Sequence, residues 1–273
     1  MKTLYISDLD GTLLRRDERV SEYTASVINE IVGRGELFSC ATARSLITAG
    51  KVLTGVRTEI PLIVYNGVFV RDIFSGRILL ANYFGEEIKK VIAALVSGGI
   101  YPVVYSMKGE RERFSYVPKL CSEETLNFLS TRKNDPRDNP VSSTAQLFEG
   151  DIFYISCIDK KEKLEPFFHK FRDSFQCLFQ SDVYSGDQWL EMLPSGASKA
   201  SAALRLKEIL DCDRIVAFGD GLNDMELFSA ADECYAVENA VPELKAIADG
   251  IIGGNDQDGV AHWLENRLIE KNM

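Results

Sequence analysis

The stretch that decides the fold is Leu4-Tyr5-Ile6-Ser7-Asp8-Leu9-Asp10-Gly11-Thr12-Leu13, close to the N-terminus. The apolar run over residues 3–6 predicts a buried strand, and two carboxylates follow it almost at once. Gly11 tolerates positive φ and therefore suits a tight turn after Asp10. Open α/β sheets bind ligands beyond the carboxyl ends of their strands. Because the carboxylates of Asp8 and Asp10 repel each other unless a cation neutralises them, we expect a hard, oxygen-binding ion such as Mg²⁺ at this edge.

Strands and helices alternate in the rest of the N-terminal part. Short apolar runs at residues 37–41 and 62–65 predict two further strands, and helical periodicity lies between them. The same rhythm resumes after Pro194, where the pattern predicts a helix over residues 198–210 and a strand over 214–218. Alternation of this kind predicts right-handed βαβ units and a parallel sheet.

The middle of the chain follows a different pattern. Residues 68–71 and 77–80 read as a hairpin, and the segment beyond them mixes helices with adjacent strands, which predicts an antiparallel α+β layer. A stretch rich in Pro, Asn, Asp and Ser, residues 134–143, predicts a loop. The expected fold is therefore α/β, a doubly wound parallel-sheet core with an inserted α+β domain. The expected boundaries are 1–82 and 191–273 for the core and 83–190 for the insertion.

Composition narrows the class of protein. The chain has 273 residues, 45% of them hydrophobic and 26% charged, which is ordinary for a globular protein. Its six cysteines are scattered, so neither a zinc site nor a disulfide framework is expected. With no signal-peptide pattern and no long apolar run, we expect a cytoplasmic location and no membrane partner. A net charge of −10 argues against nucleic acid as a partner.

A second motif follows the predicted strand 214–218, namely Gly219-Asp220-Gly221-Leu222-Asn223-Asp224. Asp220 comes directly after this strand, so we expect it at the same sheet edge as Asp8. An ordinary explanation exists for Asp224, because an acid in the first turn of a helix is stabilised by the helix dipole. The joint occurrence of this motif and the N-terminal one makes coincidence a poor explanation.

Lys199 stands at the start of the helix predicted over residues 198–210. A cation there opposes the helix dipole, which suggests that the lysine is placed to meet an anion. The alternative is an ordinary solvated surface lysine. Thr42 follows the predicted strand 37–41, and its place at the expected edge is the reason to consider it.

In chain order, these pieces resemble the signature of the haloacid dehalogenase superfamily: Asp-x-Asp-Gly-Thr, a strand-end threonine, a lysine and Gly-Asp-x-x-Asn-Asp. The insertion, with the tail Asn239-Ala240-Val241-Pro242-Glu243-Leu244-Lys245 and Asp258-Gly259-Val260-Ala261, resembles the Cof-type phosphatases of capped class IIB. The chain departs from the family pattern at Ala43, where glycine is usual, and at Val237-Glu238, where Met-Gly is usual. The resemblance implies a Rossmann-like core and an inserted cap that selects the substrate.

The resemblance also implies catalytic roles. Asp8 would be the nucleophile that forms an aspartyl-phosphate, and Asp10 would be the general acid and base. Mg²⁺ would be held by the carboxylates of Asp8 and Asp220 and by the backbone carbonyl of Asp10. Thr42 and Lys199 would hold the phosphoryl oxygens, and Asp224 would orient Lys199 or the waters of the metal. The phosphate- and substrate-binding residues implied in this way are Thr42, Ala43, Arg44, Asn66, Gly67, Lys199 and Asn223.

The expected function is therefore a Mg²⁺-dependent phosphatase acting on a small phosphorylated metabolite such as a sugar phosphate. Two alternatives stay open. A phosphosugar mutase would use the same core residues but would return the phosphoryl group to the sugar. A non-catalytic phosphate-binding module is disfavoured by the presence of both Asp8 and Asp10, since binding needs no general acid. The sequence does not indicate the oligomeric state.

Overall fold

The structure is a computed structural model that describes residues 2–182 and 185–271. The described residues fall into two compact units. The first, here named the core unit, lies within Met1–Ala81 and Ala197–Met273, and the second, the inserted unit, lies within Asn82–Gly196.

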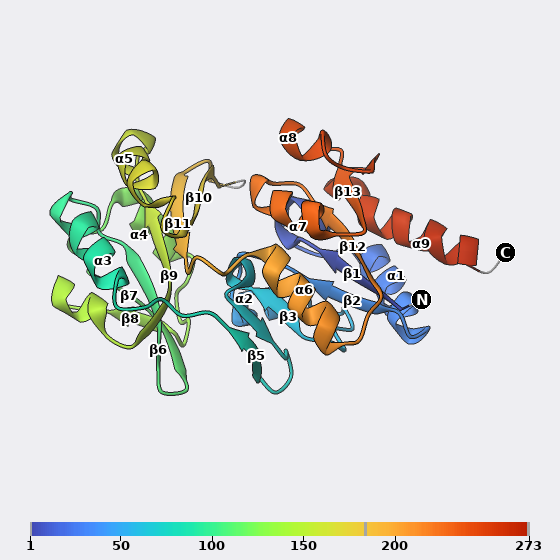
Figure 1. Cartoon of the computed structure of the whole chain (residues 1–273), viewed down its shortest axis with the longest axis horizontal. Coiled ribbons are helices and arrows are strands. Elements are labelled where there is room, and N and C mark those ends of the chain that lie inside the picture. The colour runs from blue at the N-terminus through green and yellow to red at the C-terminus, as the bar shows by residue number, and fades with distance from the viewer. Residues whose placement is uncertain (1, 183–184, 272–273) are drawn as a thin grey trace. The chain divides into compact units, whose positions relative to one another are not determined.

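The core unit is built on a five-stranded sheet in the order β14-β13-β12-β1-β2 (Figure 1). All neighbouring strands in it are parallel, which confirms the predicted parallel sheet. Because β1 lies between β12 and β2, the loops that follow these three strands meet at one edge. The strands are β1 (Thr3–Ser7), β2 (Leu37–Cys40), β12 (Arg214–Gly219), β13 (Glu233–Val237) and β14 (Gly250–Ile252).

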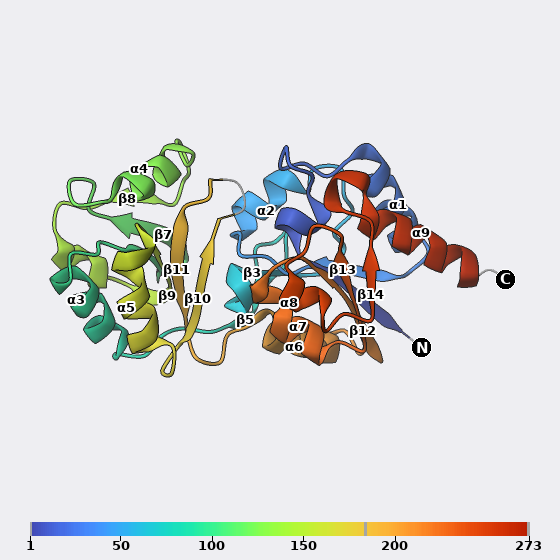
Figure 2. The same ribbon diagram turned by 90° about the horizontal axis from the view of Figure 1, so that it is seen from above.

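Helices cover both faces of this sheet, as expected for a doubly wound fold. Figure 2 shows α1 and α9 on one side and α6 and α7 on the other, and each pair is in mutual contact. The helices are α1 (Glu22–Gly33), α2 (Leu46–Val52), α6 (Lys199–Ile209), α7 (Met225–Ala230), α8 (Pro242–Lys245) and α9 (Gly259–Lys271). Within residues 2–182 and 185–271, no helix has the length and apolar character needed to cross a membrane.

The strand predicted over residues 62–65 does not join the parallel sheet as expected. Instead β3 (Leu62–Val64) forms a three-stranded sheet with β4 (Phe69–Arg71) and β5 (Ile78–Ala81). One parallel bridge, from Ala41 to Ile63, still connects it to the end of β2. The physical reason is the turn over residues 65–67, where positive φ at three successive residues reverses the chain into an antiparallel partner. The hairpin predicted over residues 68–71 and 77–80 is confirmed by the pairing of β4 with β5.

The inserted unit contains a six-stranded sheet in the order β10-β11-β9-β6-β7-β8. Its strands are antiparallel except that β8 pairs parallel with β7. Its elements are α3 (Ile88–Ser97), α4 (Glu123–Ser130), α5 (Lys161–Phe171), β6 (Val103–Lys108), β7 (Arg111–Tyr116), β8 (Asp138–Pro140), β9 (Asp151–Ile158), β10 (Gln176–Ser181) and β11 (Gln188–Leu193).

Two details of the inserted unit differ from the sequence expectation. The loop predicted over residues 134–143 contains β8, a short edge strand whose Pro140 is tolerated because an edge position needs fewer ladder hydrogen bonds. The expected boundary between residues 190 and 191 falls inside β11, and the compact unit extends to Gly196. Since β11 pairs with both β9 and β10, its last residues belong to the inserted sheet.

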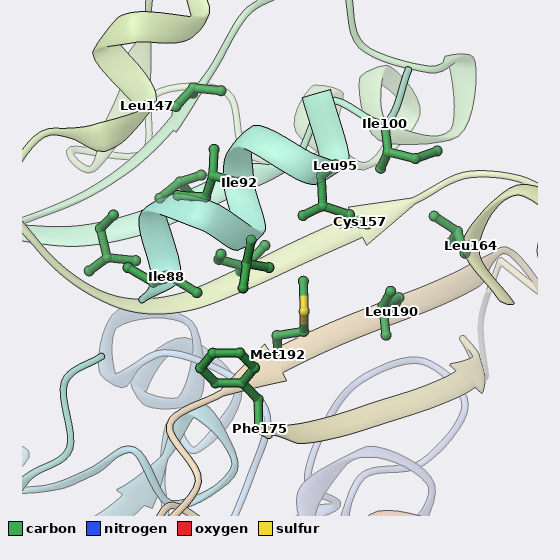
Figure 3. Packing of buried hydrophobic residues seen from close by; sticks show 14 of the residues in the cluster. Ile88, Ile92, Leu95, Ile100, Leu147, Cys157, Leu164, Phe175, Leu190 and Met192 are labelled. Carbon is green, nitrogen blue, oxygen red and sulfur yellow. The ribbon is translucent and has the colours of Figure 1, made fainter. Parts of the chain in front are cut away.

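The inserted unit has its own apolar core, which lies between its sheet and its helices. Figure 3 shows the α3 residues Ile88, Ile92 and Leu95 above the strand residues Leu190 and Met192. All five side chains are buried, and each such burial stabilises the fold by about 1.5–3 kcal/mol. The insertion is therefore packed like a domain rather than like a long loop.

Candidate active site

Asp8 occupies the carboxyl end of β1 and is buried. Its backbone N–H donates to the carbonyl of Phe218 over 2.9 Å, which ties the end of β1 to β12. The chain then turns over residues 9–13, with φ of +80° at Gly11. This left-handed value explains the need for glycine at that position. The side chain of Asp8 is therefore held on a rigid strand end, with 5% of the residue exposed.

Lys199, the first residue of α6, reaches the same place from the far end of the chain. Ser198 caps the helix through its side chain, and the Lys199 Nζ lies 2.5 Å from Asp8 Oδ1 and 2.7 Å from Asp224 Oδ1. The lysine is 1% exposed, so it is not a surface residue. Gly67 permits this approach, because a Cβ there would lie 2.0 Å from the carbonyl oxygen of Ser198.

Asp220 and Asp224 lie in the loop after β12 and join Asp8 beside Lys199. The three carboxylates are here named the acidic group. Thr12 Oγ1 donates to Asp220 Oδ1 over 3.0 Å, so the N-terminal motif holds the second motif directly. Asp224 Oδ2 accepts the backbone N–H groups of Asp220 and Gly221, each over 3.1 Å. With Oδ1 bound to Lys199, Asp224 therefore orients both the lysine and the loop that carries Asp220.

The electrostatics of this group are unbalanced. One carboxylate oxygen from each of Asp8, Asp220 and Asp224 lies within 4.8 Å of the others, and one lysine bridges two of them. Burial raises the pKa of Asp8 well above its usual value, with Lys199 opposing the shift and the neighbouring carboxylates adding to it. Burial and the charge of Asp224 raise the pKa of Asp220 to about 7. Although burial lowers the pKa of Lys199, the carboxylates of Asp224 and Asp8 outweigh it and raise that pKa.

The donor set fits a hard divalent cation. Three closely spaced carboxylates repel one another, and a divalent ion between them would remove the repulsion that adds to the effect of burial on the pKa values of Asp8 and Asp220. Asp8 and Asp220 belong both to this group and to the ligand set expected from the sequence. The third acid of the group is Asp224 rather than Asp10, although both oxygens of Asp224 already accept hydrogen bonds within the protein.

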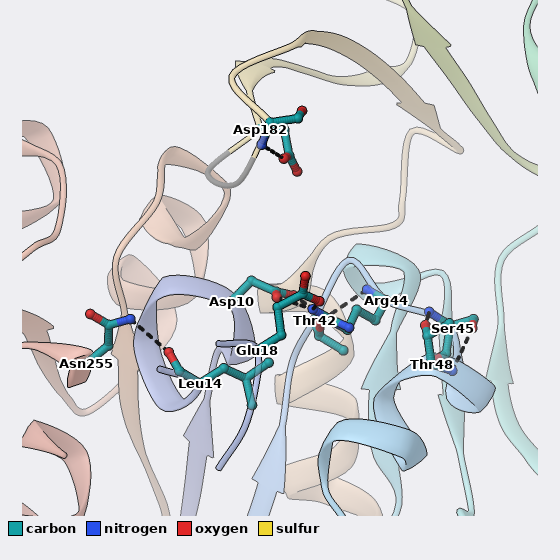
Figure 4. Close-up of polar contacts among 10 residues, drawn as sticks. Asp10, Leu14, Glu18, Thr42, Arg44, Ser45, Thr48, Asp182 and Asn255 are labelled. Carbon is teal, nitrogen blue, oxygen red and sulfur yellow. Dashed lines mark hydrogen bonds and ion pairs between the residues drawn. The ribbon is translucent and has the colours of Figure 1, made fainter. Parts of the chain in front are cut away.

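Asp10 lies beside Arg44 rather than in the acidic group. Figure 4 shows the Arg44 guanidinium on the Asp10 carboxylate, with Nε–Oδ2 and Nη2–Oδ1 distances of 2.7 and 2.5 Å. Arg44 Nη2 also donates to Glu18 over 2.7 Å. Burial lowers the pKa of Arg44, but its hydrogen bonds and charge interactions with Asp10 and Glu18 raise the pKa overall. Arg44 was expected to bind phosphate, and in this structure it orients the expected general acid.

The other expected site residues form a contiguous chain of contacts. Thr42 is fully buried, its Oγ1 accepts the backbone N–H of Arg44 over 3.1 Å, and half-buried Ala43 lies between the two. The backbone N–H of Asn66 donates to the Thr42 carbonyl over 2.9 Å. Asn223 Nδ2 in turn donates to Asn66 Oδ1 over 3.2 Å. The loops after β2, β3 and β12 are therefore joined.

Sequence reasoning missed several residues that hold the site together. Thr12 was part of the quoted motif but had no role assigned, and Glu18 carried no signal because it stands in an ordinary polar turn. Asn239 and Asn255 were also missed; the first was quoted only as part of the tail that resembles the family. Asn239 and Asn255 each contact a residue more than 200 positions away in the sequence, and no local pattern reveals such contacts.

Comparison with known families gives a match over nearly the whole chain. The family of haloacid dehalogenase-like hydrolases matches residues 5–264. Among curated proteins, the chain is 29% identical to the 5-amino-6-(5-phospho-D-ribitylamino)uracil phosphatase YwtE of Bacillus subtilis, over 98% of each chain. It is 25% identical to the HMP-PP phosphatase of Yersinia enterocolitica, over 100% of this chain and 98% of the relative.

Solved structures share the fold. A haloacid dehalogenase-like hydrolase from B. subtilis aligns with a TM-score of 0.80 and 24% identity, covering 97% of this chain and 99% of the other. The subclass IIB sugar phosphatase BT4131 aligns with a TM-score of 0.78 and 16% identity, covering 98% of this chain and 100% of the other. At these identities the two structures support the fold assignment, a parallel-sheet core with an inserted unit.

Proposed function

The chain belongs to the haloacid dehalogenase-like hydrolases and is a phosphatase of that family. From this premise we propose that it uses Mg²⁺ and forms an aspartyl-phosphate on Asp8 during the reaction. The proposed substrate is a small phosphorylated metabolite such as a sugar phosphate. The inserted unit is proposed to act as the cap that selects it. A cytoplasmic location remains a prediction of the sequence.

One observation carries the proposal. Lys199 is buried against Asp8 and Asp224, and Asp220 lies within the same acidic group. Residues from both ends of the chain therefore meet at the carboxyl end of the parallel sheet. A buried lysine with two carboxylates and a third nearby supports a site that binds both a divalent cation and an anion.

In the first proposed step, a carboxylate oxygen of Asp8 attacks phosphorus and the bond from phosphorus to the leaving oxygen breaks. Asp10 gives its proton to that leaving oxygen. Lys199 holds the Asp8 carboxylate in place and balances charge on the phosphoryl oxygens. Thr42 is proposed to hold a second phosphoryl oxygen.

In the second step, water attacks the phosphorus of the aspartyl-phosphate and gives a proton to Asp10. The carboxylate of Asp8 leaves, inorganic phosphate is released and both acids return to their starting states. In this structure Arg44 binds both oxygens of the Asp10 carboxylate, so the oxygen that carries the proton in these two transfers must first leave the guanidinium. Glu18 accepts a hydrogen bond from the same Nη2 nitrogen of Arg44 that donates to Asp10.

The carboxylates of Asp8 and Asp220 are proposed to hold Mg²⁺ together with the backbone carbonyl of Asp10. When bound, the ion supplies positive charge that offsets the phosphate oxygens and the acidic group. Asp224 is proposed to act behind these ligands, because its oxygens are bound to Lys199 and to the backbone of Asp220 and Gly221.

A phosphosugar mutase is the second candidate, since it would require the same residues. The two reactions differ in the fate of the phosphoryl group, which a mutase returns to the sugar while a phosphatase transfers it to water. The relatives named above are all phosphatases, which favours hydrolysis. The non-catalytic module is not favoured by any observation.

The test is a panel of phosphorylated metabolites assayed for release of inorganic phosphate, with Mg²⁺ and with a chelator. We expect steady release from at least one small phosphate ester with Mg²⁺ and none with the chelator. Full activity in the chelator would contradict the metal site. Isomerised sugar phosphate without release of phosphate would favour the mutase.

A further inference from the structure

We propose that Asn239 is a positioning residue for the turn of residues 10–12, an inference that rests on the function proposed above. Asn239 lies two residues beyond β13, whose carboxyl end is at the same sheet edge as that of β12. Its Nδ2 donates to the carbonyl of Gly11 over 2.7 Å, and its Oδ1 accepts the backbone N–H of Asn255 over 3.0 Å. One side-chain amide therefore joins the turn after Asp10 to the segment that precedes α9.

The turn that Asn239 holds has little room to move. A Cβ on Gly11 would lie 2.2 Å from Asp220 Oδ2, so the backbone of the turn is in close contact with that carboxylate. Thr12 Oγ1 donates to the other oxygen of Asp220. A displacement of the Gly11 carbonyl therefore moves the groups that fix the Asp220 side chain.

The segment that carries Asn239 is also bound to the backbone of Asp220. The N–H of Val241 donates to the Asp220 carbonyl over 2.8 Å. The contacts from Asn239 to Gly11, from Thr12 to Asp220 and from Val241 to Asp220 form a closed ring. Such a ring limits the relative movement of two loops, and metal ligands must keep their distances within a few tenths of an ångström.

We expect the hydrogen bonds of Asn239 to limit movement of the turn but to contribute little to the stability of the folded protein. The side chain is exposed, so water can replace its hydrogen bonds at little cost. Other contacts hold the chain just beyond the turn: Asn255 Nδ2 donates to the Leu14 carbonyl over 2.8 Å (Figure 4). Arg15 Nε donates to Asp258 Oδ1 over 3.1 Å. Removal of the Asn239 amide should therefore loosen the turn without unfolding the protein.

The test compares Asn239→Ala with a matched control, Asn29→Ala. Asn29 makes the same two kinds of contact in α1: its Nδ2 donates to the Gly55 carbonyl over 2.9 Å and its Oδ1 accepts the Arg57 N–H over 2.7 Å. Both variants lose one side-chain amide that joins two backbone segments. Only Asn239 is joined to the turn beside Asp220.

We expect Asn239→Ala to bind Mg²⁺ about 3- to 10-fold more weakly by calorimetry, the size expected from one hydrogen bond. Its kcat should fall by a similar factor while KM for the phosphate ester changes little. Hydrogen exchange of the peptide covering residues 8–14 should become faster. Asn29→Ala should match the wild type in all three measurements, and both variants should melt close to the wild-type temperature.

Wild-type Mg²⁺ affinity and wild-type exchange in Asn239→Ala would overturn the inference, as would equal losses in Asn29→Ala. Measurements on the wild type distinguish failure of this inference from failure of the proposed function. If the wild type releases no phosphate from any ester, the proposed function fails. The exchange comparison still decides whether Asn239 holds the turn.

Discussion

Two groups of buried charges, one in each unit, differ in how their charges are neutralised. In the core unit, Lys199 pairs with Asp8 and Asp224 of the acidic group but not with Asp220, and the pKa values of Asp8 and Asp220 are raised. In the inserted unit, Arg137 donates to Asp135 over 2.9 and 2.7 Å and to Glu112 over 2.8 Å, and all three side chains are buried.

The two groups of buried charges differ in how the cation meets the carboxylates, and this difference distinguishes a structural ion pair from a candidate catalytic site. Arg137 places a planar set of donors against two acceptors, and its guanidinium also lies over the Phe114 ring, 5.6 Å from the centroid. Lys199 is a single point charge among three carboxylates, so the core group has a larger formal excess of negative charge than Arg137 with its two carboxylates. Buried charge alone therefore does not mark an active site. The core group is distinguished by a larger excess of negative charge, which a divalent cation can balance.

The largest expected effect is that of Asp8→Asn. Loss of the nucleophile should reduce phosphate release by at least about 10⁴-fold. Because the substitution removes one of three repelling carboxylates, the metal-free variant should melt at or above the wild-type temperature. Phosphate release and a thermal melt check the two expectations. Undiminished turnover would contradict the proposed role of Asp8.

Asp10→Asn should have the next largest effect. Without the general acid, hydrolysis should slow by roughly 10²- to 10⁴-fold, and the aspartyl-phosphate should accumulate because Asn cannot deprotonate the attacking water. Mass spectrometry of the protein after rapid quenching detects the added phosphoryl group. A wild-type rate in this variant would remove Asp10 from the mechanism.

Arg137→Met should lower the stability of the protein, in contrast to Asp8→Asn. It leaves Asp135 and Glu112 buried without their guanidinium partner, so the free energy of unfolding should fall by about 3–5 kcal/mol. Urea unfolding measures this loss. The matched control is Lys108→Met, which breaks a half-exposed pair with Glu149 and should change stability little. Equal losses in both variants would show that burial does not distinguish the pairs.

The smallest expected effect is a pH dependence from Asp220. Its pKa is raised from the usual 3.8 to about 7, so the native state binds the proton more tightly than the unfolded state. This stability is fully present below the unfolded value and is lost as pH rises through the folded value. Without Mg²⁺, the melting temperature of the wild type should therefore fall relative to that of Asp220→Asn between about pH 5 and about pH 8.

Asp232→Asn is the control for this titration, because the backbone N–H of Ile215 lowers the pKa of Asp232 below its usual value. Its difference from the wild type should stay constant across the same pH range. With saturating Mg²⁺ the Asp220 dependence should weaken, since the ion favours the ionised carboxylate. Parallel melting curves for wild type and Asp220→Asn in the absence of metal would contradict the raised pKa.

Much of the site could be predicted because parallel strands place their carboxyl ends together. Asp8 and Asp220 each follow an apolar strand directly, so their convergence needed only the pairing of β1 with β12. Lys199 was predicted from its unfavourable place at a helix start, and its burial against Asp8 explains that place. The strand predicted over residues 62–65 was assigned to the wrong sheet because the chain reverses directly after it. The three successive positive φ values of residues 65–67 that cause the reversal have no clear sequence signal except Asn66-Gly67.

The sequence alone determined which residue types stand at the strand ends, and with them the parallel sheet and the acidic group. This was possible because apolar periodicity and motif spacing are local properties of the chain. Only the tertiary structure decided where the side chains point: Arg44 toward Asp10, Asn239 toward Gly11 and both oxygens of Asp224 into the protein. These contacts join loops that are distant in sequence, and side-chain direction there depends on turn geometry and packing that no local pattern contains.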